Sequence, residues 1–380
     1  MKQERIGILG GTFQPIHNGH LLIAKHAMEQ LSLDRVLFII DRVPPHKEIS
    51  EGASTEDRLQ MLRIALEDEP CFVPETMELT REGKSYTFDT LTELHRRFPA
   101  AKLFFLMGSD MLRSFSTWYN PQGISDLATL VCTERNGQSG GEQETADQLK
   151  ALFGTDVCLL DGVSDLSSTE VRKRVQNALP ITGLVPPGVE HYIYYRGLYQ
   201  PEQIAALYEQ LRPMLTDRRM RHTAGVLQTA LSLAAREGAD PEKTRIAALL
   251  HDCAKYLPEQ ELMQRSSDPV PILPVLHAEA GAQIAKERFG IEDPEILSAI
   301  RLHTTGDKNM HLLDKIIYLA DMIEPSRAYP GVDEIRAESD LNKAVLLGLN
   351  RTLAHVKECG GTAHPATMRA MIDLGGKTNE

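Results

Sequence analysis

The run Gly7-Ile-Leu-Gly-Gly-Thr-Phe-Gln-Pro-Ile-His17-Asn-Gly-His20 decides how the N-terminal half of this chain folds. It begins within residues 5–9, whose pattern is typical of a strand, and it leads into a helix expected at residues 19–29. Its adjacent glycines let the backbone approach a bulky anion closely, and the helix N-terminus beside them offers free N–H groups and a favourable dipole for phosphate. Two imidazoles at that point could bind oxyanions and stabilise charge on a leaving phosphate. The run therefore predicts a phosphate site at the end of the first strand.

Short apolar strands alternate with amphipathic helices through the rest of this half. Buried strands alternating with helices predict an α/β fold with a doubly wound parallel sheet, which binds ligands at the carboxyl ends of its strands. Residues 136–148 are polar and contain glycine, so we expect a mobile surface loop there. Besides the elements named above, we expect strands at residues 36–40, 102–107, 127–133 and 156–160, and helices at residues 56–67 and 88–98.

Strand patterns disappear after Pro201, where helical periodicity dominates. Asp240-Pro-Glu and Asp293-Pro-Glu have the cap-then-proline pattern of helix starts. A last short helix of the first half is expected to end near Gly197, so the sequence predicts an α/β domain at residues 1–197 and an all-α helical domain at residues 201–372. The helices expected in the second domain cover residues 201–215, 221–237, 241–250, 259–264, 277–289, 294–303, 312–323 and 341–357.

Composition and charge argue against several classes of protein. The 380 residues carry 41 Lys and Arg against 53 Asp and Glu, a formal net charge of -12, which disfavours a nucleic-acid polymer or an anionic membrane surface as the partner. No apolar run approaches the ~18 residues of a membrane span, and the first residues do not read as a secretory leader. The 5 cysteines form no Cys-x-x-Cys pair, which disfavours a disulfide framework and a thiolate zinc site. We expect a cytoplasmic protein that binds small phosphate compounds through local groups.

A second motif, Leu166-Ser-Ser-Thr-Glu-Val-Arg172, lies late in the first domain. Its hydroxyl residues can cap a helix and present N–H and hydroxyl donors, while Arg172, one turn in, can face the same anion. Together with His-x-Gly-His after Gly-Gly-Thr-Phe, it resembles the nucleotidyltransferase superfamily, and more narrowly bacterial nicotinate-mononucleotide adenylyltransferase. Four further segments match that family, namely Pro44-Pro-His-Lys47, Ser85-Tyr-Thr-Phe-Asp-Thr90, Gly108-Ser-Asp110 and Trp118-Tyr119.

The resemblance implies a Rossmann-like nucleotidyltransferase domain that makes deamido-NAD in NAD biosynthesis. The phosphate of nicotinate mononucleotide would attack the α-phosphorus of ATP in line and release pyrophosphate, with Mg²⁺ accompanying ATP. The implied catalytic residues are His17, His20, Lys47 and Arg172. The residues implied to bind ATP and nicotinate mononucleotide, with the nicotinate ring on Trp118, are Gly10, Gly11, Thr12, Phe13, Thr87, Asp110, Trp118, Tyr119, Arg135, Ser167, Ser168 and Thr169.

Histidine and aspartate residues recur on the helices expected after Pro201. His251 and Asp252 are adjacent, so one helix can give an imidazole nitrogen and a carboxylate oxygen to one metal ion, while other ligands arrive from separate helices. Imidazole with carboxylate favours Fe, Mn, Zn or a similar transition metal over Ca²⁺. Six candidate ligands are more than one ion needs, so we expect two ions ~3.5–4 Å apart that Asp252 bridges. The candidate ligands are His222, His251, Asp252, His277, His303 and Asp321.

The order of these ligands on helices resembles the HD-domain phosphohydrolase superfamily. His277, Leu302-His303-Thr-Thr-Gly306 and Asp321-Met-Ile-Glu-Pro-Ser-Arg327 resemble more specifically the HD family of symmetrical bis(5′-nucleosyl)-tetraphosphatases. This resemblance implies metal-assisted hydrolysis of diadenosine tetraphosphate to two ADP, with Asp252 in the catalytic centre. Iron is the metal expected, with Mn and Zn as alternatives. Lys255 could act in catalysis by contacting a substrate phosphate or the leaving oxygen, and Arg327 could also contact phosphate, or both could form ordinary ion pairs.

Alternatives stay open at both domains. The first could adenylylate another phosphate substrate, such as phosphopantetheine, although Tyr86-Thr-Phe-Asp89 and Trp118 disfavour it. The second could act on another phosphoester, or could sense nucleotides and regulate the transferase without turnover, although its ligand set is intact. The chain departs from the transferase family at Gln14 and Asp41, where Asp and Asn are usual. The expected partners are ATP, nicotinate mononucleotide and diadenosine tetraphosphate, and a homo-oligomer is left open.

Overall fold

The computed structural model describes residues 3–41, 52–81, 83, 85–135, 141–163, 166–267 and 270–376. The chain forms two compact units, one of residues 1–172 with 183–189 and one of residues 173–182 with 190–380. The domain limits of 1–197 and 201–372 stay a prediction.

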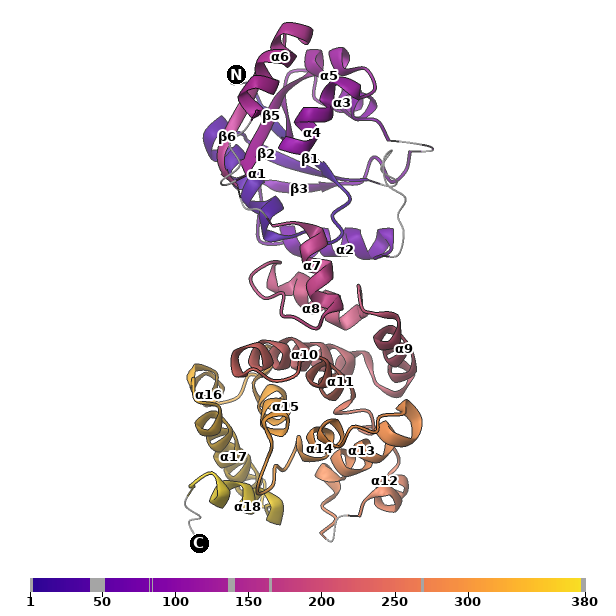
Figure 1. The fold of residues 1–380 in the computed structure, drawn as a ribbon, viewed down its shortest axis with the longest axis vertical. Coiled ribbons are helices and arrows are strands. Elements are labelled where there is room, and N and C mark those ends of the chain that lie inside the picture. Colours follow the sequence, from indigo (N-terminus) through magenta and orange to yellow (C-terminus); the bar gives the residue numbers. More distant parts are fainter. Residues whose placement is uncertain are drawn as a thin grey trace. The chain divides into compact units, whose positions relative to one another are not determined.

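The first unit is built on a parallel sheet, as the sequence predicts (Figure 1). The strand order is β3-β2-β1-β4-β5-β6, and each neighbouring pair is parallel. The order reverses between β1 and β4, and doubly wound sheets bind ligands outside the carboxyl ends of the strands at such a point. The short edge strand β3, which contains Pro74, was not expected from the sequence pattern. The strands are β1 (Arg5–Gly11), β2 (Arg35–Ile40), β3 (Phe72–Glu75), β4 (Lys102–Gly108), β5 (Ala128–Arg135) and β6 (Val157–Val163).

Helices connect these strands and cover the sheet. Helix α6 corrects the expectation of a loop at residues 136–148, of which residues 136–140 lie outside the described residues. Ala146 and Leu149 are buried on one face of α6, and Gly154 in the left-handed region ends it. The polar residues around that narrow apolar face hid it in the sequence. The helices that begin in this unit are α1 (Asn18–Leu31), α2 (Thr55–Leu66), α3 (Thr87–Arg97), α4 (Ser109–Ser114), α5 (Pro121–Leu127), α6 (Glu142–Phe153), α7 (Ser168–Gln176) and α8 (Pro187–Arg196).

The second unit is a helical bundle, which confirms the all-α prediction for the C-terminal half. Helix α10 packs against α11 and α15, and α14 packs against α11, α13 and α15. Asp240 and Asp293 accept backbone N–H bonds at the starts of α11 and α14, as their sequence patterns predict. No helix of the described residues combines the length and apolarity needed to cross a membrane. The helices are α9 (Glu202–Leu211), α10 (Asp217–Glu237), α11 (Pro241–Leu250), α12 (Glu259–Arg265), α13 (Leu276–Phe289), α14 (Pro294–Leu302), α15 (Leu312–Ile323), α16 (Val332–Ala337), α17 (Leu341–Glu358) and α18 (Pro365–Asp373).

A buried arginine ties together the segments that follow β1 and β2. Arg58, on α2, is fully buried, and its Nη1 donates to the backbone carbonyls of Thr12 (2.8 Å) and Asp41 (2.9 Å). Its Nη2 donates to Thr55 Oγ1 at 3.2 Å. Both carbonyls lie at the carboxyl edge of the sheet, so Arg58 fixes the backbone where a ligand would bind.

Replacing Arg58 with Leu should destabilise the first unit by about 2–4 kcal/mol, because two buried carbonyls would lose their donors. The chain has 1 Trp, at position 118 in this unit, so urea unfolding followed by tryptophan fluorescence reports on this unit. The control is R63L, on the exposed side of the same helix. An unfolding midpoint of R58L equal to that of R63L would contradict the role given to Arg58.

Candidate functional site

Two histidines meet at the start of α1. His17 is the N-cap residue of the helix, and its ring stacks on that of His20 with the ring centroids 3.7 Å apart. The backbone N–H of His17 donates to His20 Nδ1 at 3.2 Å. The Phe13 ring packs edge-on against His20 at 5.1 Å, and Phe13 itself has a φ of 45°. The turn after β1 thus adopts a conformation that holds both imidazoles at the helix N-terminus.

Burial makes both imidazoles neutral at pH 7. It lowers the pKa of His17 to about 4, and burial together with the neighbouring His17 lowers the pKa of His20 well below its usual value. His17 Nδ1 is buried and has no hydrogen-bond partner among the described residues. At the end of β1, a Cβ placed on Gly10 would meet no atom within 4 Å. The described part of the chain therefore leaves open space and an unsatisfied polar atom at the predicted phosphate site.

The second motif lies against the first. Ser168 Oγ donates to the carbonyl of Pro15 at 2.9 Å, and Arg172 Nη1 donates to the carbonyl of Gln14 at 2.7 Å. Arg172 Nη2 also donates to Thr169 Oγ1 at 3.3 Å, while Ser167 Oγ accepts the N–H of the residue three positions later. Gln14 contributes a backbone atom to this junction, so its departure from the family residue leaves the bond intact.

The candidate nicotinate residues form an aromatic group near the end of β4. The half-buried Trp118 ring packs against Phe115 (5.5 Å) and edge-on against Phe105 (6.0 Å). The ring of Tyr119, which is 57% exposed, lies 4.8 Å from that of Tyr86. Trp118 therefore makes core contacts with part of its ring. The sequence alone could not distinguish such packing from a role in stacking on a ligand.

The structure describes only some of the other residues predicted to bind substrate. Thr87 is the first residue of α3, next to the aromatic group. Asp110 is exposed and pairs with Arg113 at 2.9 Å. Lys47 and the side chain of Arg135 lie outside the described residues.

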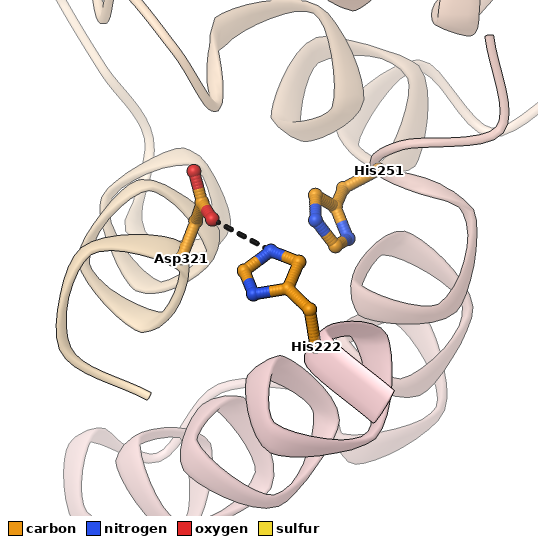
Figure 2. Close-up of side chains that lie close together, drawn as sticks. All are labelled: His222, His251 and Asp321. Carbon is orange, nitrogen blue, oxygen red and sulfur yellow. Dashed lines mark ion pairs between the residues drawn. The ribbon is translucent and has the colours of Figure 1, made fainter. Parts of the chain in front are cut away.

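The second unit brings the six predicted metal ligands together from separate helices. His222 comes from α10, His277 from α13 and Asp321 from α15, while His251 and His303 directly follow α11 and α14. Figure 2 shows His222, His251 and Asp321 converging, with His222 Nε2 2.9 Å from Asp321 Oδ1. Ligand atoms lie within 4.8 Å of one another in two overlapping groups, His222 with His251 and Asp321, and His251 with Asp252 and His303.

Asp252 lies buried at the centre of this cluster. Its Oδ2 faces Nε2 of His251 (3.2 Å) and of His222 (3.8 Å). Its Oδ1 faces Nε2 of His277 (3.2 Å) and of His303 (3.7 Å). The two oxygens of one carboxylate thus point to two different pairs of imidazoles, which is the arrangement needed to bridge two ions.

Three histidines have their Nδ1 atoms bound, which leaves Nε2 for the cluster. Nδ1 of His251 lies 2.7 Å from the backbone carbonyl of Ala248, and Nδ1 of His303 lies 2.7 Å from the backbone carbonyl of Ile300. In His222 it lies 3.0 Å from Glu324 Oε1. Such outer contacts fix the ring orientation of metal-binding histidines.

The protonation states suit metal ligands. Burial lowers the pKa of His251, and it lowers the pKa of His277 to about 4, so both rings are neutral at pH 7. Burial would raise the pKa of Asp252, but the facing imidazoles hold it well below its usual value. Among the residues that the structure describes, Nε2 of His222, Nε2 of His251 and Oδ1 of Asp252 are buried and find no hydrogen-bond partner of good geometry. Burial would lower the pKa of His222, but its hydrogen bonds to Asp321 and Glu324 raise it, so metal binding there would compete with a proton. The neutral imidazoles of His251 and His277 and the ionised carboxylate of Asp252 fit one or two transition-metal ions.

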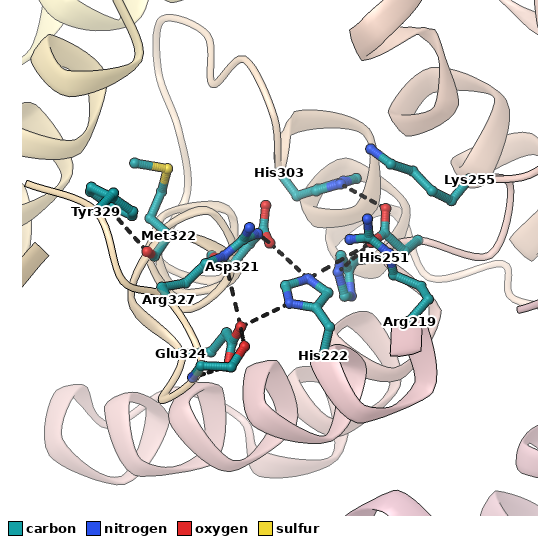
Figure 3. A network of polar contacts seen from close by, with 12 residues as sticks. Arg219, His222, His251, Lys255, His303, Asp321, Met322, Glu324, Arg327 and Tyr329 are labelled. Atoms are coloured by element: carbon teal, nitrogen blue, oxygen red, sulfur yellow. Dashed lines mark hydrogen bonds and ion pairs between the residues drawn. The ribbon is translucent and has the colours of Figure 1, made fainter. Parts of the chain in front are cut away.

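Basic side chains surround the cluster (Figure 3). Arg219 Nη1 lies 2.7 Å from Asp252 Oδ2, and Lys255 Nζ lies 3.1 Å from His277 Nε2. Arg327 Nε donates to the backbone carbonyl of Asp321 at 2.8 Å, and its guanidinium also binds the carboxylate of that residue. Burial lowers the pKa of Lys255. Sequence reasoning missed Arg219, although its place three residues before His222 puts it on the same helix face.

Comparisons with known proteins match both units. Residues 8–174 match the family described as cytidylyltransferase-like, and residues 219–326 match the HD domain. A Mycoplasma genitalium protein named probable nicotinate-nucleotide adenylyltransferase/Ap4A hydrolase is 32% identical over 374 residues, which cover 94% of this chain and 100% of that protein. A Citrifermentans bemidjiense protein named probable nicotinate-nucleotide adenylyltransferase is 41% identical over 211 residues, covering 51% of this chain and 98% of that protein. The solved structure of a predicted HD superfamily hydrolase involved in NAD metabolism, from Clostridium acetobutylicum, is 40% identical and covers 45% of this chain and 96% of its own, with a TM-score of 0.42.

The buried imidazole of His17 should titrate near pH 4 in the free protein, because burial penalises its charged form. Since folding disfavours this imidazolium, the free energy of unfolding should fall as the pH drops from 6.5 towards about 4. NMR titration of protein labelled with ¹⁵N-histidine, assigned with the variant H17Q, measures the midpoint. A midpoint at or above 6.5 would show that the ring is not buried as described.

Proposed function

Because the chain belongs to the family of two-domain nicotinate-nucleotide adenylyltransferase/Ap4A hydrolase proteins, it is a nucleotidyltransferase and a metal-dependent phosphohydrolase, and we propose the reaction of each unit. The first unit transfers AMP from ATP to nicotinate mononucleotide and releases deamido-NAD and pyrophosphate. The second unit hydrolyses diadenosine tetraphosphate to two ADP.

The junction of the two phosphate motifs carries the transferase proposal. Ser168 and Arg172 bind the backbone carbonyls of the loop that leads to His17 and His20, so the motifs form one site. In the reaction, a phosphate oxygen of nicotinate mononucleotide attacks the α-phosphorus of ATP, and the bond to the pyrophosphate oxygen breaks. No side chain needs to act as a nucleophile, so positioning and charge neutralisation carry the catalysis.

Each group of the site has a distinct part in this proposal. The neutral rings of His17 and His20 donate N–H bonds to the triphosphate, and the N-terminus of α1 adds its dipole. Arg172 supplies positive charge, since a guanidinium has five N–H donors and can contact phosphate while it holds Gln14. Mg²⁺ accompanies ATP. Lys47 and Arg135 are assigned to phosphates by the family resemblance.

The aromatic group is assigned to nicotinate mononucleotide. The exposed part of the Trp118 ring would stack on the nicotinate ring, and Thr87 with the backbone of Trp118 and Tyr119 would read its carboxylate. Asp110, which is exposed beside Arg113, would contact ribose. The end of β1 and the loop after it would bind ATP through Gly10, Gly11, Thr12 and Phe13, opposite Ser167, Ser168 and Thr169.

The central position of Asp252 carries the hydrolase proposal. Its Oδ2 faces His222 and His251, which with Asp321 would hold one ion, and its Oδ1 faces His277 and His303, which would hold a second ion together with Asp252. Bound divalent metal supplies Lewis-acid activation of the phosphate and of the attacking water. Iron is the metal proposed, with Mn and Zn as alternatives.

Basic side chains would neutralise the charge that builds on the substrate. Water attacks the second phosphorus of diadenosine tetraphosphate, the bridge to the third phosphorus breaks, and the bridging oxygen leaves with the other ADP. Lys255 and Arg219, both beside the ligand groups, are placed to contact the phosphates. Arg327 keeps Asp321 in place and could add its charge.

Variants at the two sites should separate the two activities in the full chain. H20A should lower the rate of adenylyl transfer by about 100- to 1,000-fold, because the triphosphate loses an oriented donor, and it should leave hydrolysis unchanged. D252N should lose bound metal and hydrolysis while adenylyl transfer stays at the rate of the unchanged protein. Assays with ATP and nicotinate mononucleotide, and with diadenosine tetraphosphate, measure the rates, and elemental analysis gives the metal content.

The control for H20A is H26A, which removes a second histidine of α1 outside the loop motif. Near-normal transfer by H20A would overturn the role of the loop. Hydrolysis that survives in D252N, or in metal-stripped protein, would overturn the metal mechanism.

A further inference from the structure

Glu324 is a buried carboxylate behind the metal cluster. It directly follows α15 and is 1% exposed. Its Oε1 lies 3.0 Å from Nδ1 of His222, on the side of that ring opposite Asp321. The backbone N–H of Ser326 donates to its Oε2 at 2.7 Å, and the hydroxyl of Ser326 binds its Oε1. The carboxylate is therefore held in one orientation by a tight turn (Figure 3).

This partner sets His222 apart from the other ligand histidines with bound Nδ1 atoms. His251 and His303 have neutral backbone carbonyls behind them. His222 has an anion instead, and a carboxylate behind a ligand imidazole raises its basicity and fixes its tautomer. His222 belongs to only one of the two overlapping ligand groups, so only that group contains a histidine with a carboxylate behind it.

Helix α10 is shaped to accommodate this carboxylate. A Cβ on Gly225, almost one turn after His222, would lie 2.5 Å from Glu324 Oε2. The side chain of Glu324 could retreat from such a contact only by breaking its bonds to Ser326 or His222. Glycine at this position therefore preserves the contact between Glu324 and His222.

We propose that Glu324 is a positioning residue that strengthens metal binding specifically at the His222, His251 and Asp321 position. It holds Nε2 of His222 towards Asp321 and makes this ring a stronger ligand than His303, which has only a carbonyl behind it. The proposal rests on the proposed metal centre. It assigns the two ion positions different affinities, with the tighter one next to Glu324.

Competitive zinc titration with a chromophoric chelator on the metal-free full chain tests this. The unchanged protein should bind two ions in two steps. E324Q keeps the size of the side chain but removes its charge, so the affinity of the tighter step should fall about 10- to 100-fold while the weaker step is unchanged. G225A should have an effect in the same direction without altering Glu324 itself, and E334Q, an exposed change on α16, is the control.

A second measurement separates positioning from catalysis. At saturating zinc or manganese, hydrolysis by E324Q should return to within a few-fold of the unchanged rate, because the reacting groups remain. Unchanged binding steps in both E324Q and G225A would overturn the role of Glu324 while leaving the metal centre in place. If the protein without any substitution takes up no metal ion, the proposed function and this inference are both overturned.

Discussion

The buried carboxylate of Asp252 is the constraint on which the helical unit depends. An isolated charge of this kind costs several kcal/mol in a protein interior, so it must be surrounded by groups that compensate it. Its two oxygens face four imidazoles, which arrive from or just after α10, α11, α13 and α14. The packing of these helices is therefore tied to a cluster of polar groups as well as to apolar contacts. Metal ions would satisfy the same buried ligand atoms, so stability and chemistry are linked at one place.

The two units deal with phosphate by different physical means. In the first, burial keeps the imidazoles of His17 and His20 neutral, and oriented donors with a helix N-terminus would face the anion. In the second, ionised carboxylates would bind cations, which would in turn bind the substrate. A formal net charge of -12 is compatible with both, because each site creates its own local potential. The acidic composition thus bears on polymeric partners and says little about small phosphate substrates.

Periodicity and motif spacing predicted the parallel sheet, the helical half and the six candidate ligands, which the structure brings together, because each depends on local pattern or on residues with few ordinary roles. The stretch 136–148, expected as a loop, is helical from residue 142, because the two apolar residues that α6 buries, Ala146 and Leu149, lie among polar residues that mask the helical pattern. Arg58 and Glu324 were missed for another reason. Each acts through contacts with residues far away in the chain, and a charged residue in a helix or turn is usually exposed. Only the folded chain shows that these two are buried and paired.

The central claim is that the cluster around Asp252 is a metal centre that cleaves its substrate symmetrically. Hydrolysis of diadenosine tetraphosphate by the metal-loaded chain in H₂¹⁸O, followed by mass spectrometry of the products, tests it most directly. The account predicts ADP as the sole nucleotide product, with one ¹⁸O atom in half of the ADP molecules. Formation of ATP and AMP, or no turnover by protein that holds its metal, would contradict it.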